Sequence, residues 1–324
     1  MVEHSGIQRQ VTANQGPGSA TGSHWLLLIT AGFAWGATYS LAKIATEGQV
    51  HPVALNFWQT SFGFVALLLY TLLRRRRFPV TQSHIRFYIV AGVLGTVIPG
   101  VLYFIAARHL PAGILAITIA TVPMLTLIVS RALGSERLSF ARVIGISLGA
   151  VGILFILVPD TSLPDASAAP YVLLAVVCAL CYAIENIYID FRMPSGEALT
   201  ILCGMLAVAS LITAPFVVAF DAFWWPSWPL GAVEWSIVWM ALINAFAYGT
   251  FVHLVTTAGP VFASQTAYVV TLSGVAWGMI IFAEAHSPWV VAATACMMVG
   301  LVLVRPRTSP SKGPESNPTA LVRT

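Results

Sequence analysis

The sequence contains few charged residues: only 9% of its 324 positions are Asp, Glu, Lys or Arg. Soluble domains carry roughly a quarter charged residues. The 16 basic and 12 acidic residues would therefore cover the surface of a soluble protein of this length poorly. The mean hydropathy of +0.84 agrees with this shortage of charge. Together the two values nearly exclude a soluble enzyme and favour an integral membrane protein.

Several motifs of common enzyme classes are also missing. No G-x-x-x-x-G-K-[ST] phosphate loop occurs, which argues against direct use of ATP, and no acid-rich diphosphate motif is present. The four cysteines all fall within apolar stretches, so we expect neither a disulfide at the outer face nor a metal site. Cys178 and Cys181 form a C-x-x-C pair that we interpret as part of a helical core. No cofactor is predicted.

One pattern suggests an enzyme at first sight. Gly145, Ser147 and Gly149 match G-x-S-x-G, but a nucleophile elbow requires a turn from a strand into a helix, and this pattern lies inside an apolar run. An intramembrane serine protease that uses Ser147 with His253 is the only enzymatic alternative that the residues allow. We therefore expect a protein that is not an enzyme.

What the sequence does contain is a series of apolar stretches of about 20 residues, the length that a helix needs to cross a bilayer. In hydrocarbon each backbone polar group must be satisfied within its own segment, so these stretches predict helices and an all-α membrane protein. The ten predicted spans are 25–46, 53–73, 85–107, 111–132, 140–158, 170–189, 198–220, 234–257, 260–283 and 288–304.

The basic residues predict the orientation of these spans. If both termini are cytoplasmic, 14 of the 16 basic residues lie at the inner face, and only Lys43 and Arg108 lie at the outer face. A model with nine spans would invert half of the loops and lose this asymmetry. Residues 1–24 and 307–324 are rich in small and polar residues and are predicted to be disordered cytoplasmic tails.

The second half of the chain repeats features of the first. An offset of 148 residues places Thr96 on Asn244, Thr118 on Thr266, Glu136 on Glu284 and Gly152 on Gly300. Five spans in each half is an odd number, so the halves must have opposite orientations in the membrane. Inverted repeats of this kind are typical of secondary transporters, which bind their substrate near the midplane between the repeats.

Two stretches carry a family resemblance. Pro111 to Pro159 contains PAGILAITIATVPMLTLIVSRALGSERLSFARVIGISLGAVGILFILVP, and its second copy, Pro260 to Pro306, contains TLSGVAWGMIIFAEAHSPWVVAATACMMVGLVLVRP. Together with the opening segment GFAWGATYSLAKIA, they resemble the drug/metabolite transporter superfamily of the type with two EamA domains. The second copy has AEAHS where the first has GSERLS, so it lacks the basic residue that follows the glutamate.

The resemblance implies a transporter whose first five-helix repeat is 25–158 and whose second is 170–306, joined by an outer-face loop at 159–169. It also implies a multi-pass protein of the bacterial inner membrane. The narrower likeness is to bacterial exporters of aromatic and other neutral amino acids. The expected partners are therefore a small-molecule substrate and the lipid bilayer, with no nucleic acid.

Glu185 is the one acidic residue in the interior of a predicted span, because Glu234 lies at the first position of its span. Even on insertion scales a charged residue at the centre of a membrane helix costs about 2.5 to 3.5 kcal/mol, so its presence suggests a proton site or a counter-ion for an ammonium group. The alternative is structural. Glu185 is near the cytoplasmic end of its helix, and its side chain can reach interfacial water or bond Tyr188 or Asn186.

Other polar and aromatic residues recur at helical spacing on the spans expected to surround a cavity. Mostly apolar linings with a few polar groups suit small neutral solutes. Interhelical hydrogen bonds explain each residue taken singly. The predicted substrate-binding residues are Trp35, Tyr39, Thr96, Tyr103, Tyr182, Glu185, Asn244, Tyr248, Gln265 and Tyr268.

The sequence therefore predicts a secondary transporter that exports small neutral solutes by alternating access. Export of another metabolite or drug, a passive channel and the intramembrane protease remain alternatives. The glycine pairs Gly32/Gly36, Gly145/Gly149 and Gly274/Gly278 have the spacing that lets membrane helices pack closely.

Overall fold

The computed structural model describes residues 21–136, 138–158, 161–163 and 165–304, and within these ranges it contains helices and no strands. Most of the predicted tails lie outside the described residues. Residues 22–24, which we assigned to the N-terminal tail, instead form the first turn of α1 (Gly22–Glu47).

Eight helical segments among the described residues are long and apolar enough to cross a membrane. They are α1, α2 (Pro52–Leu73), α3–η1–α4 (Gln82–Gly92, Val93–Val97, Ile98–His109), α5–α6 (Ala112–Ile119, Val122–Ala132), α7 (Phe140–Leu157), η2–α8 (Ala166–Ala168, Ala169–Arg192), α9 (Ala198–Ala219) and α10 (Ala232–Ala258). The short helix α11 (Pro260–Ala263) follows, and then two shorter apolar helices, α12 (Thr266–Phe282) and α13 (Pro288–Val304). The protein is therefore an all-helical multi-pass membrane protein, and the count of ten spans remains a prediction.

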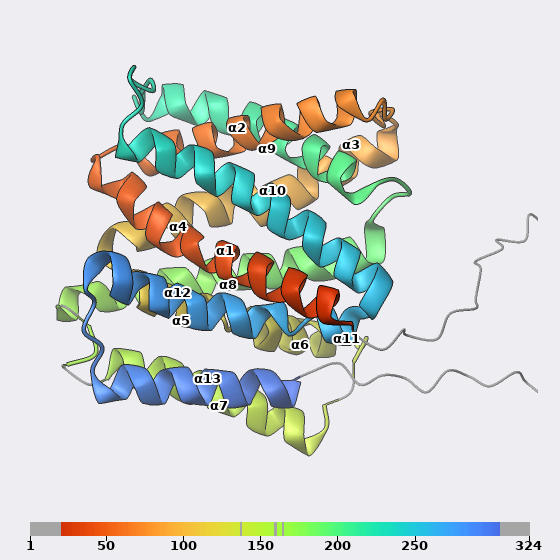
Figure 1. Cartoon of the computed structure of the whole chain (residues 1–324). Helices are drawn as coiled ribbons and strands as arrows, with labels where there is room; N and C mark the ends of the chain where they lie inside the picture. The colour runs from red at the N-terminus through yellow and green to blue at the C-terminus, as the bar shows by residue number, and fades with distance from the viewer. Residues whose placement is uncertain (1–20, 137, 159–160, 164, 305–324) are drawn as a thin grey trace, which may run out of the picture.

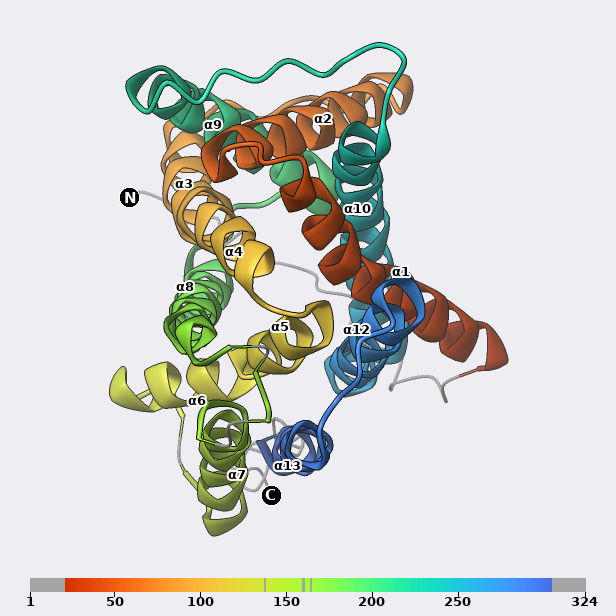
Figure 2. The ribbon, with the colours of Figure 1, turned by 90° about the vertical axis from the view of Figure 1, so that its left-hand side faces the viewer.

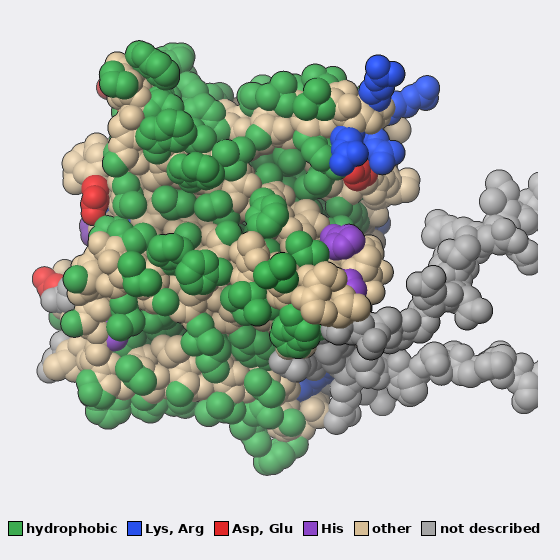
Figure 3. Space-filling view, in the orientation of Figure 1, with side chains coloured by type: hydrophobic (Ala, Val, Ile, Leu, Met, Phe, Trp, Pro, Cys, Tyr) green, Lys and Arg blue, Asp and Glu red, His purple; other side chains and the backbone are tan. Residues whose placement is uncertain are grey.

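The charged residues gather at opposite ends of the helices. Figure 3 shows Lys and Arg side chains at the end where α2 passes into α3, and most of the visible Asp and Glu side chains at the other end. The basic group contains Arg74 to Arg77, which are exposed. Figure 1 shows that α1 begins and α13 ends at this same basic end. The arrangement follows the charge asymmetry expected from the sequence, although which end is cytoplasmic stays a prediction.

Two of the crossing segments are irregular in the middle. The segment α3–η1–α4 contains a π-helical turn, Val93–Val97, immediately before Pro99. The segment α5–α6 is interrupted at Ala120 and Thr121, just before Pro123. Proline has no N–H to donate, so a helix loosens beside it, and π-helical turns often occur at functional sites.

The helices of the two halves pack on each other in a reciprocal pattern. Helix α1 contacts α10 and α12, while α8, which has the corresponding place in the second half, contacts α4 and α6. Helix α2 packs on α9, and α7 packs on α13. Figure 2 shows α1, α4, α5 and α8 arranged around the middle of the molecule.

Close helix contacts occur at the predicted glycine pairs. A Cβ atom added at Gly32 would lie 2.7 Å from Val269 Cβ, and one at Gly145 would lie 2.9 Å from the carbonyl oxygen of Gly300. The glycines thus let α1 approach α12 and let α7 approach α13. Our interpretation of these pairs as packing sites agrees with these contacts.

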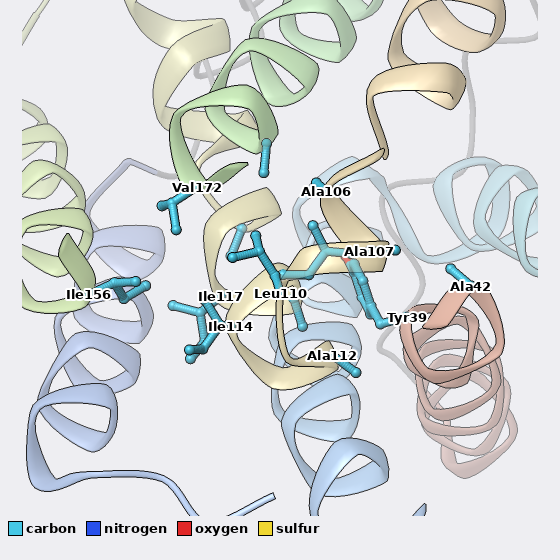
Figure 4. Close-up of a cluster of buried hydrophobic side chains, with 14 of the residues drawn as sticks. Tyr39, Ala42, Ala106, Ala107, Leu110, Ala112, Ile114, Ile117, Ile156 and Val172 are labelled. Carbon is cyan, nitrogen blue, oxygen red and sulfur yellow. The ribbon is translucent and has the colours of Figure 1, made fainter. Parts of the chain in front are cut away.

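The largest cluster of buried apolar side chains joins α1, α4, α5, α7 and α8 and also includes side chains of α6 and α13. Figure 4 shows Tyr39 and Ala42 of α1 facing Ala106, Ala107 and Leu110, and Ile114 and Ile117 of α5 in the centre. Leu110 and Ile114 are almost completely inaccessible. The contact between α1 and the turn from α4 to α5 is therefore densely packed.

Candidate functional site

Three tyrosines from three helices meet in the middle of the bundle. The rings of Tyr39 (α1) and Tyr103 (α4) have centroids 6.0 Å apart, and the Tyr103 hydroxyl donates a hydrogen bond of 3.3 Å to the carbonyl oxygen of Thr38. Tyr182 (α8) is close enough to both rings to interact electrostatically, and it shares a side-chain hydrogen bond with Cys178. Cys178 in turn donates to the carbonyl oxygen of Pro99 at 3.3 Å. The packing brings these predicted site residues together.

Glu185 lies next to this cluster, on the same face of α8 as Cys178 and Tyr182, because residues i, i+4 and i+7 share one face of a helix. It interacts electrostatically with Tyr182 and with Tyr248 of α10. Its carboxylate rests on Gly95, in the π-helical turn, where any Cβ atom would overlap with it. No basic side chain pairs with Glu185 within the described part of the chain.

Tyr103, Tyr182 and Glu185 are half-buried, so none of the three side chains is completely inaccessible. The cluster therefore places tyrosine rings and one carboxylate side by side within the bundle.

Trp35 and Asn244 form a polar link between α1 and α10. The indole Nε1 of Trp35 donates a hydrogen bond of 3.0 Å to Asn244 Oδ1. Both side chains are half-buried. Two predicted binding residues therefore satisfy each other in this structure, and they join helices that are 209 positions apart in sequence.

The Trp35 to Asn244 bond is testable by a double-mutant cycle. We expect Trp35→Phe and Asn244→Leu each to lower the thermal midpoint in detergent, with a coupling free energy of about 0.6 kcal/mol, typical of hydrogen bonds between membrane helices. Trp277→Phe is the matched control, because Trp277 donates to the backbone oxygen of Phe33 at 3.0 Å and its loss should add independently to Asn244→Leu. Strict additivity of Trp35→Phe and Asn244→Leu would disprove the coupling.

Besides Trp35 and Asn244, three predicted residues are not part of the tyrosine cluster. Thr96 is in the π-helical turn beside Gly95, and Gln265 precedes the first turn of α12. Tyr268 borders a cavity of about 270 Å³ towards the basic end of the helices. That cavity is lined by side chains of α6, α7, α8, α12 and α13 and the residues that flank them: Val122, Pro123, Thr126, Leu127, Ser130, Glu136, Arg142, Asn186, Ser264, Ala267, Tyr268, Leu301 and Val304. The ten predicted residues thus do not form one pocket.

Sequence reasoning missed an ion pair at this cavity. Arg142 Nη1 lies 2.8 Å from Glu136 Oε2, and the Arg142 side chain is buried at the start of α7. The glutamate belongs to the repeated motif, and the arginine follows it six positions later, which was the available signal. Gly95 was missed too. A single glycine in an apolar run gives no sequence signal that a carboxylate from another helix packs against it.

The enzymatic alternative gains no support from the geometry. Ser147 is exposed on α7, which packs on α13, whereas His253 is exposed on α10, which packs on α1 and α2. Cys178, Cys181, Cys203 and Cys296 are free thiols. Within the described residues no group of three or more His, Cys, Asp or Glu side chains is arranged to hold a metal.

Comparison with known proteins agrees with a transporter. Residues 23–158 match the EamA-like transporter family, which confirms the resemblance indicated by the sequence. The inner membrane transporter YedA of Escherichia coli K12, described as uncharacterized, is 26% identical over 77% of this chain and 85% of its own length. The uncharacterized transporter YoaV of Bacillus subtilis is 22% identical over 67% of this chain and 74% of its own.

A solved crystal structure has a related fold. It aligns with a TM-score of 0.59 over 87% of this chain and 96% of its own length, with 19% sequence identity. At that level of identity the similarity concerns the fold alone.

Proposed function

Since residues 23–158 match the EamA-like transporter family, we propose that this chain is a secondary transporter of the bacterial inner membrane. It exports small neutral solutes, most of all aromatic and other apolar amino acids. The apolar helices support the membrane location, and the description of the Escherichia coli relative as an inner membrane transporter supports the inner membrane.

The reciprocal packing supports ten spans in two inverted repeats, 25–158 and 170–306. Corresponding helices of the two halves exchange their contacts, as in the pairs α1 with α10 and α8 with α4. A two-fold relation within the membrane plane produces this pattern. In such transporters one bundle rocks against the other about a central site, and each end of that site opens in turn.

The observation that carries the proposed substrate class is an acidic side chain among tyrosine rings. Glu185 has no basic partner among the described residues and interacts electrostatically with Tyr182 and Tyr248. Tyr39 and Tyr103 lie on the other side of Tyr182 as its neighbours. An ammonium group is attracted both to a carboxylate and to the faces of aromatic rings. The apolar side chain of an amino acid would pack on the same rings.

Counterflow tests this proposal. Purified protein in liposomes loaded with unlabelled phenylalanine or tryptophan is expected to take up external labelled phenylalanine, and the rate should saturate. Unlabelled aromatic amino acids should compete, whereas an acidic amino acid should not. A flux that never saturates would indicate a channel, and saturable flux of another solute without competition by any amino acid would indicate a different exporter.

A further inference from the structure

A carboxylate links two helices at the end of the molecule opposite the arginines. Glu284 follows α12, and its two oxygens accept hydrogen bonds from the backbone N–H groups of Ala112 (2.6 Å) and Gly113 (3.0 Å). These are the first two residues of α5, whose N–H groups have no partner within the helix. The negative charge is also favourable beside the positive end of the helix dipole. Glu284 thus ties the end of α12 to the start of α5, 172 positions away.

A second charged residue holds the same segment from the other side. Lys43 Nζ, at the last turns of α1, donates a hydrogen bond of 3.1 Å to the carbonyl oxygen of Leu110 and lies 5.7 Å from the centroid of the Phe282 ring. The short turn from α4 to α5 is therefore fixed by a lysine of the first half and a glutamate of the second. His286 Nε2 lies 3.7 Å from Glu284 Oε2 and completes the group.

The opposite ends of the same helices are farther apart. Near Glu284, α12 packs on α5. Towards the basic end, the cavity of about 270 Å³ lies between residues of α6, such as Thr126, and Tyr268 of α12. The two membrane segments α5–α6 and α11–α12 are thus joined at one end and separated by a cavity at the other.

We propose that Glu284 and Lys43 form a latch that closes the outer end of the transporter while the other end is open. The inference rests on the proposed alternating access, and it assigns to these residues a gating role instead of contact with the substrate. When the latch opens, α12 separates from the start of α5, and the tyrosine cluster becomes reachable from the end at which Glu284 lies.

The internal repeat identifies the counterpart at the other end. The offset of 148 residues that places Glu136 on Glu284 also places the start of α5 at 112 on the start of α11 at 260. Glu136 lines the cavity and pairs with Arg142 in this structure. Glu136 is therefore the residue at the basic end that corresponds to Glu284.

The latch is tested by the accessibility of Ser287, whose hydroxyl oxygen is buried in the loop that follows Glu284. In the full chain carrying Ser287→Cys, we expect Glu284→Gln to raise the rate of labelling by a membrane-impermeant maleimide about tenfold. Glutamine can accept only one of the two hydrogen bonds and has no charge. Losing the other hydrogen bond and the charge should shift the equilibrium between the closed and open outer end about tenfold towards the open state. Lys43→Met should raise the rate as well.

The controls separate the latch from a general disturbance. Glu47→Gln removes an exposed carboxylate at the same end of the molecule and should leave the labelling rate unchanged. Chains without Ser287→Cys give the background of the native thiols, and the reagent is added both to spheroplasts and to inverted vesicles, which identifies the side that opens. Equal labelling of the Glu284→Gln and parent chains, both monodisperse in gel filtration, would overturn the latch.

Lys43→Met decides the question if Glu284→Gln does not fold. The readout needs no substrate, so an incorrect substrate class leaves it unaffected. Conversely, normal saturable counterflow together with unchanged labelling would reject the latch and leave the transport function in place.

Discussion

Replacing Glu185 with glutamine is expected to lower the saturable counterflow of labelled phenylalanine at least about tenfold. The change keeps the size of the side chain but removes the charge that we propose binds the substrate ammonium, and hydrogen bonds to charged groups contribute about 1.5 to 3 kcal/mol. Because Gly95 leaves room for the carboxylate, glutamine should fit in the same place. The loss should therefore appear in transport while the thermal midpoint stays close to that of the parent chain.

The matched control for Glu185 is Asp190→Asn. Asp190 is an exposed carboxylate on the same helix, five positions further on, and its neutralisation should leave the rate unchanged. Uptake should be measured for both variants at several pH values between about 5.5 and 8. If the Glu185→Gln rate equals that of the parent at every pH, Glu185 has no part in the mechanism and its burial is structural.

Replacing Gly36 with valine is expected to prevent normal assembly of the bundle. A Cβ atom at this position would overlap with Ser273 Oγ and would lie 2.8 Å from both the backbone nitrogen of Gly274 and the backbone oxygen of Val270. Backbone atoms of a neighbouring helix cannot rotate away as a side chain can, so α1 and α12 would have to separate. Overpacking of a core typically costs 1 to 3 kcal/mol or more.

Gly22→Val is the control for Gly36→Val, because no atom lies within 4 Å of a Cβ added at Gly22, at the start of the same helix. Gel filtration in detergent and the yield of membrane-inserted protein are the measurements. We expect Gly36→Val to give aggregated or strongly reduced protein and Gly22→Val to behave like the parent. A monodisperse Gly36→Val chain with an unchanged thermal midpoint would show that the contact between α1 and α12 is not required.

The predicted span boundaries agree with the structure to within a few residues, as in 53–73 against Pro52–Leu73. Hydropathy over about 20 residues is a local property. An apolar segment of that length forms a helix in the bilayer because its backbone groups must be hydrogen-bonded within the segment. The sequence predicted only part of the irregularity within the spans. Pro99 and Pro123 indicated a disturbance, but the π-helical turn at Val93–Val97 depends on what packs beside it.

The candidate site was predicted less completely. Polar and aromatic residues on helical faces identified Tyr39, Tyr103, Tyr182 and Glu185, which do meet. The same reasoning included Tyr268, which lines a cavity that none of these four residues borders. The spacing of residues shows which of them share one face of a helix. It does not show which other helix packs against that face, or at which depth in the membrane the residues lie.

The sequence by itself determined that this is a helical membrane protein whose charged residues lie mostly at the ends of its helices, with one acidic residue inside a span. It also predicted two related halves. These properties follow from composition, helix periodicity and the physics of the bilayer, which act on residues close together in the chain. Only the tertiary structure decided that Glu185 rests on Gly95, that Trp35 bonds Asn244, and that Glu284 holds the start of α5. Each of these contacts joins residues 90 or more positions apart, and in a membrane such pairs are selected by helix packing, because hydrophobicity does not distinguish one apolar helix from another.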